Sequence, residues 1–144
     1  MPLFTLAELE AALPLVRSVV PETPQHAWPL LARRTGAQVW VKHENHTPIG
    51  AFKIRGGVVY LDALKRSGRR WAGVVTATRG NHGQSIALAA ARAGLPCTIF
   101  VPHGNSREKN AAMTSLENPR TGRITALSAV AALRRLTATL VVGT

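Results

Sequence analysis

The chain has 144 residues, which is enough for one domain with a modest core and too few for two. Apolar residues make up 46% and charged residues 17%, so the composition is that of a globular protein and excludes a disordered polar chain. Lys and Arg total 18 against 7 Asp and Glu, a formal net charge of +11. Aromatic residues are only 5% and no nucleic-acid-binding module is present, so nucleic acid is not a predicted partner.

The sequence also bears on the compartment. The single cysteine, Cys97, lies in an apolar run; it cannot form an internal disulfide, and we interpret it as a core residue. No run approaches the roughly 18 apolar residues of a membrane-spanning helix. Glu8 and Glu10 lie where a signal peptide would be basic and then apolar. We therefore expect a cytoplasmic protein with no membrane association, and we predict no metal site.

The sequence of the N-terminal third predicts short, separate helices and a strand. Thr5 begins a capping-box pattern that predicts a helix, which Pro14 ends or kinks. Several prolines then indicate an irregular stretch over residues 21–29. A short helix over 30–35 and a strand over 39–41 follow. We assign residues 1–36 to an N-terminal helical arm.

From residue 37 the pattern becomes an alternation of strands and helices. The expected elements are a helix over 51–65, a strand over 73–77, a helix over 82–93, a strand over 97–101 and a helix capped by Ser106. Short connections between such elements predict an α/β fold, a parallel sheet with flanking helices and right-handed crossovers. Ligands of such sheets bind at the carboxyl ends of the strands, beside helix N-termini. Residues 37–113 are the predicted α/β domain.

After Met113 the alternation is lost. Residues 114–144 contain one acidic residue, Glu117, and a break at 118–122. Residues 126–142 are helical or strand-like by turns: leucines and a valine over residues 127–140 fit one helical stripe, and no clean strand continues the alternation. We leave this tail unassigned.

Lys53 stands at the start of a predicted helix, and that position affects its chemistry. The positive end of the helix dipole and the nearby Arg55 both disfavour a protonated amine. A neutral lysine amine can attack an aldehyde and form a Schiff base. The alternative is an ordinary surface lysine on an amphipathic helix, and this segment alone does not exclude it.

A second loop, Thr78–Ser85, joins a predicted buried strand to a helix. Its glycines flank Asn81 and His82, so the backbone can approach a flat anionic ligand closely. Asn81 can donate to a phenolate oxygen, and free amides at the helix start can hold a carboxylate. Alone, such a loop is often a plain turn. Two such loops at successive strand ends indicate a binding site.

The segment from Trp40 to Met113 resembles the N-terminal part of the serine/threonine dehydratases. These are pyridoxal-phosphate (PLP) enzymes of the tryptophan-synthase β-subunit fold, fold type II. The resemblance rests on Phe52-Lys53-Ile54-Arg55-Gly56, which is similar to the family's Schiff-base lysine motif, and on Gly80-Asn81-His82-Gly83-Gln84, which is similar to its asparagine loop. It implies the small α/β domain of this fold, truncated before the large domain.

The resemblance also implies roles for individual residues. Lys53 would form the Schiff base with PLP and then act as the base for the substrate's α-proton, with Phe52 beside the cofactor. Asn81 would hydrogen-bond the ring oxygen of PLP. The substrate carboxylate would bind, largely through backbone amides, at Thr78, Gly80 and His82. The implied reaction converts a β-hydroxy amino acid, threonine or serine, to a 2-oxo acid and ammonia, and full-length relatives would be homo-oligomers.

Two departures from the family pattern leave alternatives open. Arg79 replaces a usually small residue and either binds a second carboxylate, as in 3-hydroxyaspartate, or points to solvent. No glycine-rich phosphate cradle follows Asn81, so we expect a truncated or frame-shifted dehydratase. The alternatives are an inactive fragment or basic non-catalytic binding polypeptide, a short protein with its own C-terminal helix, and a related lyase acting on diaminopropionate.

Overall fold

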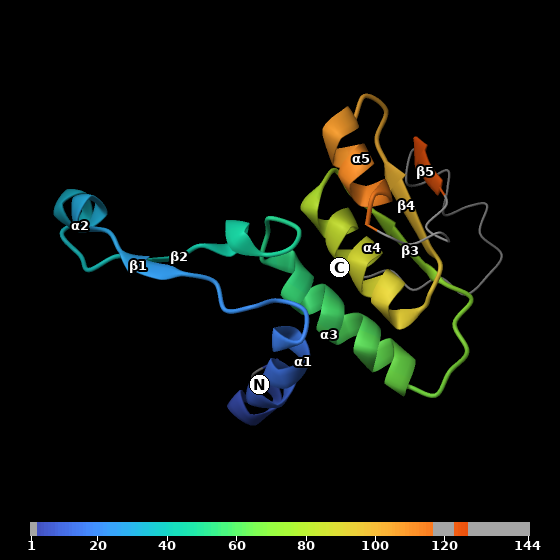
Figure 1. Ribbon diagram of the computed structural model, residues 1–144, viewed down its shortest axis with the longest axis horizontal. Coiled ribbons are helices and arrows are strands. Elements are labelled where there is room, and N and C mark those ends of the chain that lie inside the picture. Colours follow the sequence, from blue (N-terminus) through green and yellow to red (C-terminus); the bar gives the residue numbers. More distant parts are fainter. Residues whose placement is uncertain (1–2, 117–122, 127–144) are drawn as a thin grey trace. The chain divides into compact units, whose positions relative to one another are not determined.

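The computed structural model describes residues 3–116 and the backbone of residues 123–126 (Figure 1). The chain divides into two compact units, Met1–Phe52 and Lys53–Thr144, and each is described by itself. Among these described residues, no helix has the length and apolar character needed to cross a bilayer.

Helix α1 (Leu6–Arg17) opens the first unit with the predicted capping box. The Glu8 amide donates to Thr5 Oγ1 at 3.2 Å, and the Glu8 carboxylate accepts from the Thr5 amide at 2.7 Å. This backbone hydrogen bond, with a second from the Thr5 hydroxyl, lowers the pKa of Glu8. The helix does not end at Pro14, because Pro14 lies inside it and three further residues are helical.

A small antiparallel pair follows, in which β1 (Gln25–Ala27) pairs with β2 (Trp40–Lys42). The prediction of a wholly irregular stretch over 21–29 is therefore wrong for β1. Between the strands, α2 (Pro29–Thr35) forms where the short helix was expected, and the chain leaves it through a glycine at φ 69°. A 3-10 turn, η1 (Glu44–His46), comes after β2.

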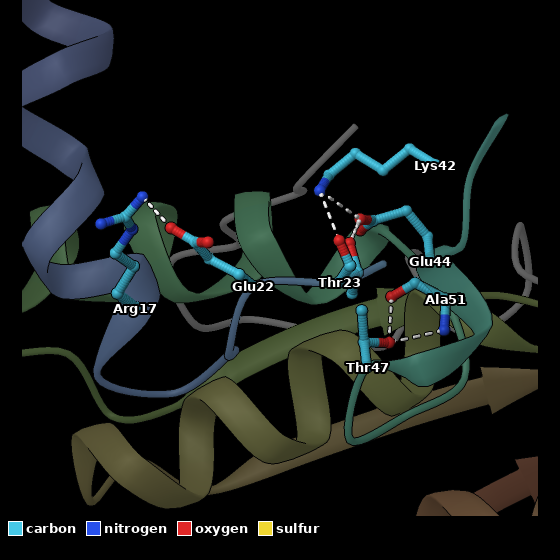
Figure 2. A network of polar contacts seen from close by, with 7 residues as sticks. All are labelled: Arg17, Glu22, Thr23, Lys42, Glu44, Thr47 and Ala51. Carbon is cyan, nitrogen blue, oxygen red and sulfur yellow. Dashed lines mark hydrogen bonds and ion pairs between the residues drawn. The ribbon is translucent and has the colours of Figure 1, made fainter. Parts of the chain in front are cut away.

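Side chains tie the loops of this unit together (Figure 2). Thr23 Oγ1 donates to Glu44 Oε1 at 2.6 Å, and Lys42 Nζ donates to the Thr23 carbonyl at 3.2 Å. Thr47 Oγ1 accepts from the Ala51 amide and donates to the Ala51 carbonyl, both at 2.8 Å. The single hydroxyl of Thr47 thus closes the loop that precedes Phe52.

The second unit contains a parallel sheet of order β3-β4-β5, formed by β3 (Val74–Ala77), β4 (Cys97–Val101) and β5 (Arg123–Ala126). The predicted parallel sheet of an α/β fold is confirmed for β3 and β4. The tail that the sequence left unassigned contributes one strand, because β5 pairs in parallel with β4. The predicted helical stripe over 127–140 lies outside the described residues.

Helix α4 (Asn81–Ala93) is central to this unit. It packs against α3 (Lys53–Arg66), against β3 and β4, and against α5 (Arg107–Thr114) (Figure 1). Its buried positions are occupied by small residues and one isoleucine, which let neighbouring elements approach closely. Two predicted helix caps are confirmed. Gly94 ends α4 at φ 71°, and Ser106 begins α5, where its Oγ accepts from the Lys109 amide at 3.4 Å.

The core of the second unit is aliphatic. Its largest fully buried side chains are Ile54, Leu61 and Met113. Cys97 is also buried, at 3% exposure, and burial raises the pKa of its thiol to about 12. The interpretation of Cys97 as a core residue is confirmed.

Candidate functional site

The fold brings the start of α3 beside the start of α4. Strand β3 ends at Ala77, the chain turns through Thr78–Gly80, and α4 begins at Asn81. Ser85, on the second turn of α4, donates its hydroxyl hydrogen to the Lys53 carbonyl at 2.7 Å. Lys53 and the start of α4 therefore lie side by side within the second unit.

Lys53 and His82 lie within electrostatic reach of each other. Lys53 is exposed at the first position of α3, and His82 is half-buried on the first turn of α4. His82 Nε2 lies 2.9 Å from the hydroxyl of the buried Thr76. Burial lowers the pKa of His82, and the positive charge of Lys53 lowers it further. At neutral pH the site thus carries a lysine beside an uncharged imidazole.

Asn81 is exposed at the first position of α4, where backbone amides lack helical acceptors. The Thr78 amide donates to the Phe100 carbonyl at 2.9 Å, and the Gly80 amide donates to Thr78 Oγ1 at 3.1 Å. Of the amides of residues 78–84, those of residues 79, 81 and 82 have no acceptor in the described part of the chain. The helix dipole favours an anion at these amides.

Of the three residues expected to bind the substrate carboxylate through their amides, only one has an amide that is free to do so. His82 offers a free amide, whereas the amides of Thr78 and Gly80 already have acceptors. Arg79 is exposed, and none of its polar atoms has a partner among residues 3–116. Phe52, the residue before Lys53, is 63% exposed.

Two glycines of the loop have different surroundings. A Cβ on Gly83 would lie 2.4 Å from Met113 Sδ and 2.5 Å from Thr78 Cγ2, so this position is closed to any side chain. For a Cβ on Gly80 the nearest atoms would belong to the flexible side chain of Lys109, beginning with Cδ at 3.3 Å. A side chain at Gly80 would thus need only Lys109 to shift, whereas Gly83 packs against Met113 of α5.

Sequence reasoning missed Thr76, Ser85 and Lys109. Each contacts a residue that is distant along the chain or lies on another element. Ser85, for example, donates a hydrogen bond to Lys53, 32 positions earlier. No local pattern marks such a contact. Only the regular small-residue face of the predicted helix over 82–93 indicated a close neighbour there.

The sequence profile of the family described as "Pyridoxal-phosphate dependent enzyme" matches residues 16–139. The chain belongs to this family. The match confirms the resemblance found in the sequence and extends it beyond Trp40 and Met113 on both sides. PLP is the cofactor of the family, and the family's ammonia-lyases are PLP-dependent lyases.

Individual relatives are similar to this chain over part of their length. A biosynthetic L-threonine dehydratase of Lactococcus lactis is 35% identical over 102 residues, which are 71% of this chain and 24% of that protein. An L-threo-3-hydroxyaspartate ammonia-lyase of a Pseudomonas species is 44% identical over 80 residues, 56% of this chain and 25% of that protein. The chain thus spans about a quarter of the length of these curated relatives.

Among solved structures, maize serine racemase is similar with a TM-score of 0.72 and 28% identity. That match covers 87% of this chain and 37% of the racemase chain. The likeness supports the fold type II architecture expected from the sequence.

The described residues fit the aldehyde and ring-oxygen side of PLP. Lys53 offers an exposed amine, and Asn81 offers an exposed amide donor at the start of the adjoining helix. Near Gly80 lies the flexible side chain of Lys109, whose Cδ is 3.3 Å from the position of a Cβ at that residue. Together with the free amides at the start of α4, Lys53 and Asn81 would offer PLP a covalent anchor and a polar contact, and would offer an anion a binding site.

Proposed function

We propose that this chain carries the lysine and asparagine side of the active site of a PLP-dependent ammonia-lyase acting on a β-hydroxy amino acid, threonine or serine. One observation carries the proposal: the first residue of α3, Lys53, is hydrogen-bonded through its carbonyl to α4, at whose start Asn81 and three free amides lie. PLP requires an amine and a hydrogen-bond donor, and the carboxylate of an amino acid substrate requires an anion site.

When bound, PLP supplies an aldehyde that captures amines and a ring that withdraws electrons from the substrate's α-carbon. Lys53 would hold the cofactor covalently and afterwards accept the α-proton at Nζ. Asn81 would donate its side-chain N–H to the ring oxygen. The amides of residues 79, 81 and 82 would hold and orient the substrate carboxylate, which fixes the direction of the α-C–H bond.

His82 has a supporting role in this proposal. Its lowered pKa keeps the imidazole neutral, so it adds no positive charge that would compete with Lys53 for the carboxylate. Its Nε2 is engaged with Thr76 at 2.9 Å, which fixes the ring. Loss of the α-proton and the β-hydroxyl would together release one water molecule, and a second water molecule would then displace the nitrogen as ammonia and leave a 2-oxo acid.

A second candidate substrate is 3-hydroxyaspartate, and Arg79 favours it. Arg79 is exposed in the loop, without a partner in the described part of the chain, and can reach a second carboxylate. The 44% identity to a protein named L-threo-3-hydroxyaspartate ammonia-lyase supports this candidate. Replacing Arg79 with Ala would lower activity on 3-hydroxyaspartate more than on threonine; equal losses would exclude the idea.

Absorption spectroscopy of the purified chain tests the proposal. On addition of PLP we expect a visible band, lost in Lys53→Ala and retained in Lys65→Ala, which removes an exposed lysine at the other end of α3. A colourless protein, or a band that survives Lys53→Ala, would contradict it. A colourless protein that binds nucleic acid with steep salt dependence would instead identify the basic binding polypeptide.

A further inference from the structure

We propose that Ser85 is a positioning residue for Lys53, and that Gly57 provides the space its hydroxyl needs. The inference rests on the proposed function, because it concerns how the lysine amine is held beside Asn81. Ser85 lies on α4, Gly57 and Lys53 lie on α3, and all three belong to the same compact unit.

The contact is direct and shielded. Ser85 Oγ donates to the Lys53 carbonyl at 2.7 Å, and Ser85 is only 1% exposed. Water therefore competes little for this hydrogen bond. In an α-helix the same carbonyl accepts from the amide four residues on, which here is Gly57, so the serine occupies the second lone pair of the oxygen.

Gly57 permits this arrangement. A Cβ at that position would lie 2.2 Å from Ser85 Oγ and 3.2 Å from the Ser85 carbonyl oxygen. Any side chain at residue 57 would displace the hydroxyl that holds Lys53. The neighbouring Gly56 shows that this is not a general property of the helix, because a Cβ there would meet nothing within 4 Å.

The position of Lys53 explains why an anchor is useful. It is the first residue of α3, and terminal turns of helices open most readily. A covalently bound cofactor must stay aligned with Asn81 on α4 for proton transfer to succeed. A hydroxyl of α4 bound to the lysine's own carbonyl links the amine-bearing residue to the element that carries Asn81.

The test compares Ser85→Ala with Ser67→Ala. Ser67 makes the same type of bond, Oγ to the Leu64 carbonyl at 2.7 Å, at the exposed far end of α3. PLP affinity is measured by titrating the visible band of each folded variant. We expect Ser85→Ala to bind PLP about three- to tenfold more weakly and Ser67→Ala to match the parent.

A second readout needs no cofactor. The charge of Lys53 lowers the pKa of His82, so an NMR titration of His82 reports whether the amine stays nearby. We expect the pKa of His82 to rise in Ser85→Ala. In a Lys53→Met background, Ser85→Ala should leave it unchanged, because the charge being moved is absent.

The outcomes separate this inference from the proposed function. Unchanged PLP affinity and an unchanged His82 titration in Ser85→Ala would overturn the positioning role. If the parent chain itself does not attach PLP, the proposed function fails, and the His82 titration alone still decides the role of Ser85. A variant of Ser85 that does not fold is replaced by Gly57→Ala, which displaces the same hydroxyl while keeping the serine.

Discussion

Two adjacent glycines of α3, Gly56 and Gly57, respond in opposite directions to the same substitution. Gly56→Ala adds a methyl group to open space, so only helix propensity changes and stability should rise by about 0.5–1 kcal/mol. Gly57→Ala gains the same propensity but places its methyl group 2.2 Å from Ser85 Oγ. Overpacking costs about 1–3 kcal/mol and loss of the bond to Lys53 about 1 kcal/mol.

The net effect of Gly57→Ala is therefore a destabilisation of about 1–3 kcal/mol, and the two variants should differ by about 2–4 kcal/mol. Urea unfolding of both proteins, followed by circular dichroism, measures this difference. Adding Ser85→Ala to Gly57→Ala should recover part of the loss, because the closest remaining atom is the Ser85 carbonyl oxygen at 3.2 Å. A Gly57→Ala protein as stable as Gly56→Ala would refute the close packing of α3 on α4.

Three further predictions concern the loop and the core. Gly83→Ala should destabilise the protein by about 1–3 kcal/mol because Met113 must move, whereas Gly80→Ala should change stability by less than about 0.5 kcal/mol; similar urea midpoints for both would contradict the structure. The thiol of Cys97, with a pKa of about 12, should resist iodoacetamide at pH 8 until the chain is unfolded, and labelling at the rate of a free cysteine would contradict its burial. His82 has a folded pKa below the ordinary value of 6.5, so the unfolded state binds its proton first and stability should fall as the pH drops from 6.5 toward the folded pKa. Urea midpoints measured across that window should show a weaker slope in His82→Asn, and an unchanged slope would show that His82 is not the group responsible.

Local signals predicted much of the second unit. The buried run at 97–101 appears as β4 with the same bounds, and the glycine after Ala93 ends α4 as expected. Such features depend on residues within one or two turns of each other. The same holds for the capping box at Thr5, whose two partners are three residues apart.

Elements that depend on distant partners were not predictable. Strand β1 has three exposed residues and forms through pairing with β2. Strand β5 lies in a segment without a periodic pattern and forms through pairing with β4. Helix α1 continues past Pro14, because a proline removes one hydrogen bond and need not end the helix at that point.

The candidate site shows the same division. Lys53 and Asn81 were recognisable from motifs within a few residues of each. The expectation that both follow successive strands of one parallel sheet is wrong for Lys53, because β2 pairs with β1 in a separate antiparallel sheet. The bond from Ser85 to the Lys53 carbonyl spans 32 residues, and the space at Gly57 has meaning only once α4 is packed against it. Two consecutive glycines in a helix otherwise indicate only weak helical propensity.

Covalent trapping tests the central claim, that Lys53 is the residue that holds PLP, most directly. The chain is incubated with PLP, reduced with borohydride, digested, and its lysine-containing peptides are examined by mass spectrometry. The sequence has four lysines, Lys42, Lys53, Lys65 and Lys109, which serve as internal controls for one another. We expect the reduced cofactor predominantly on Lys53; equal labelling of all four lysines, or none at Lys53, would contradict the account.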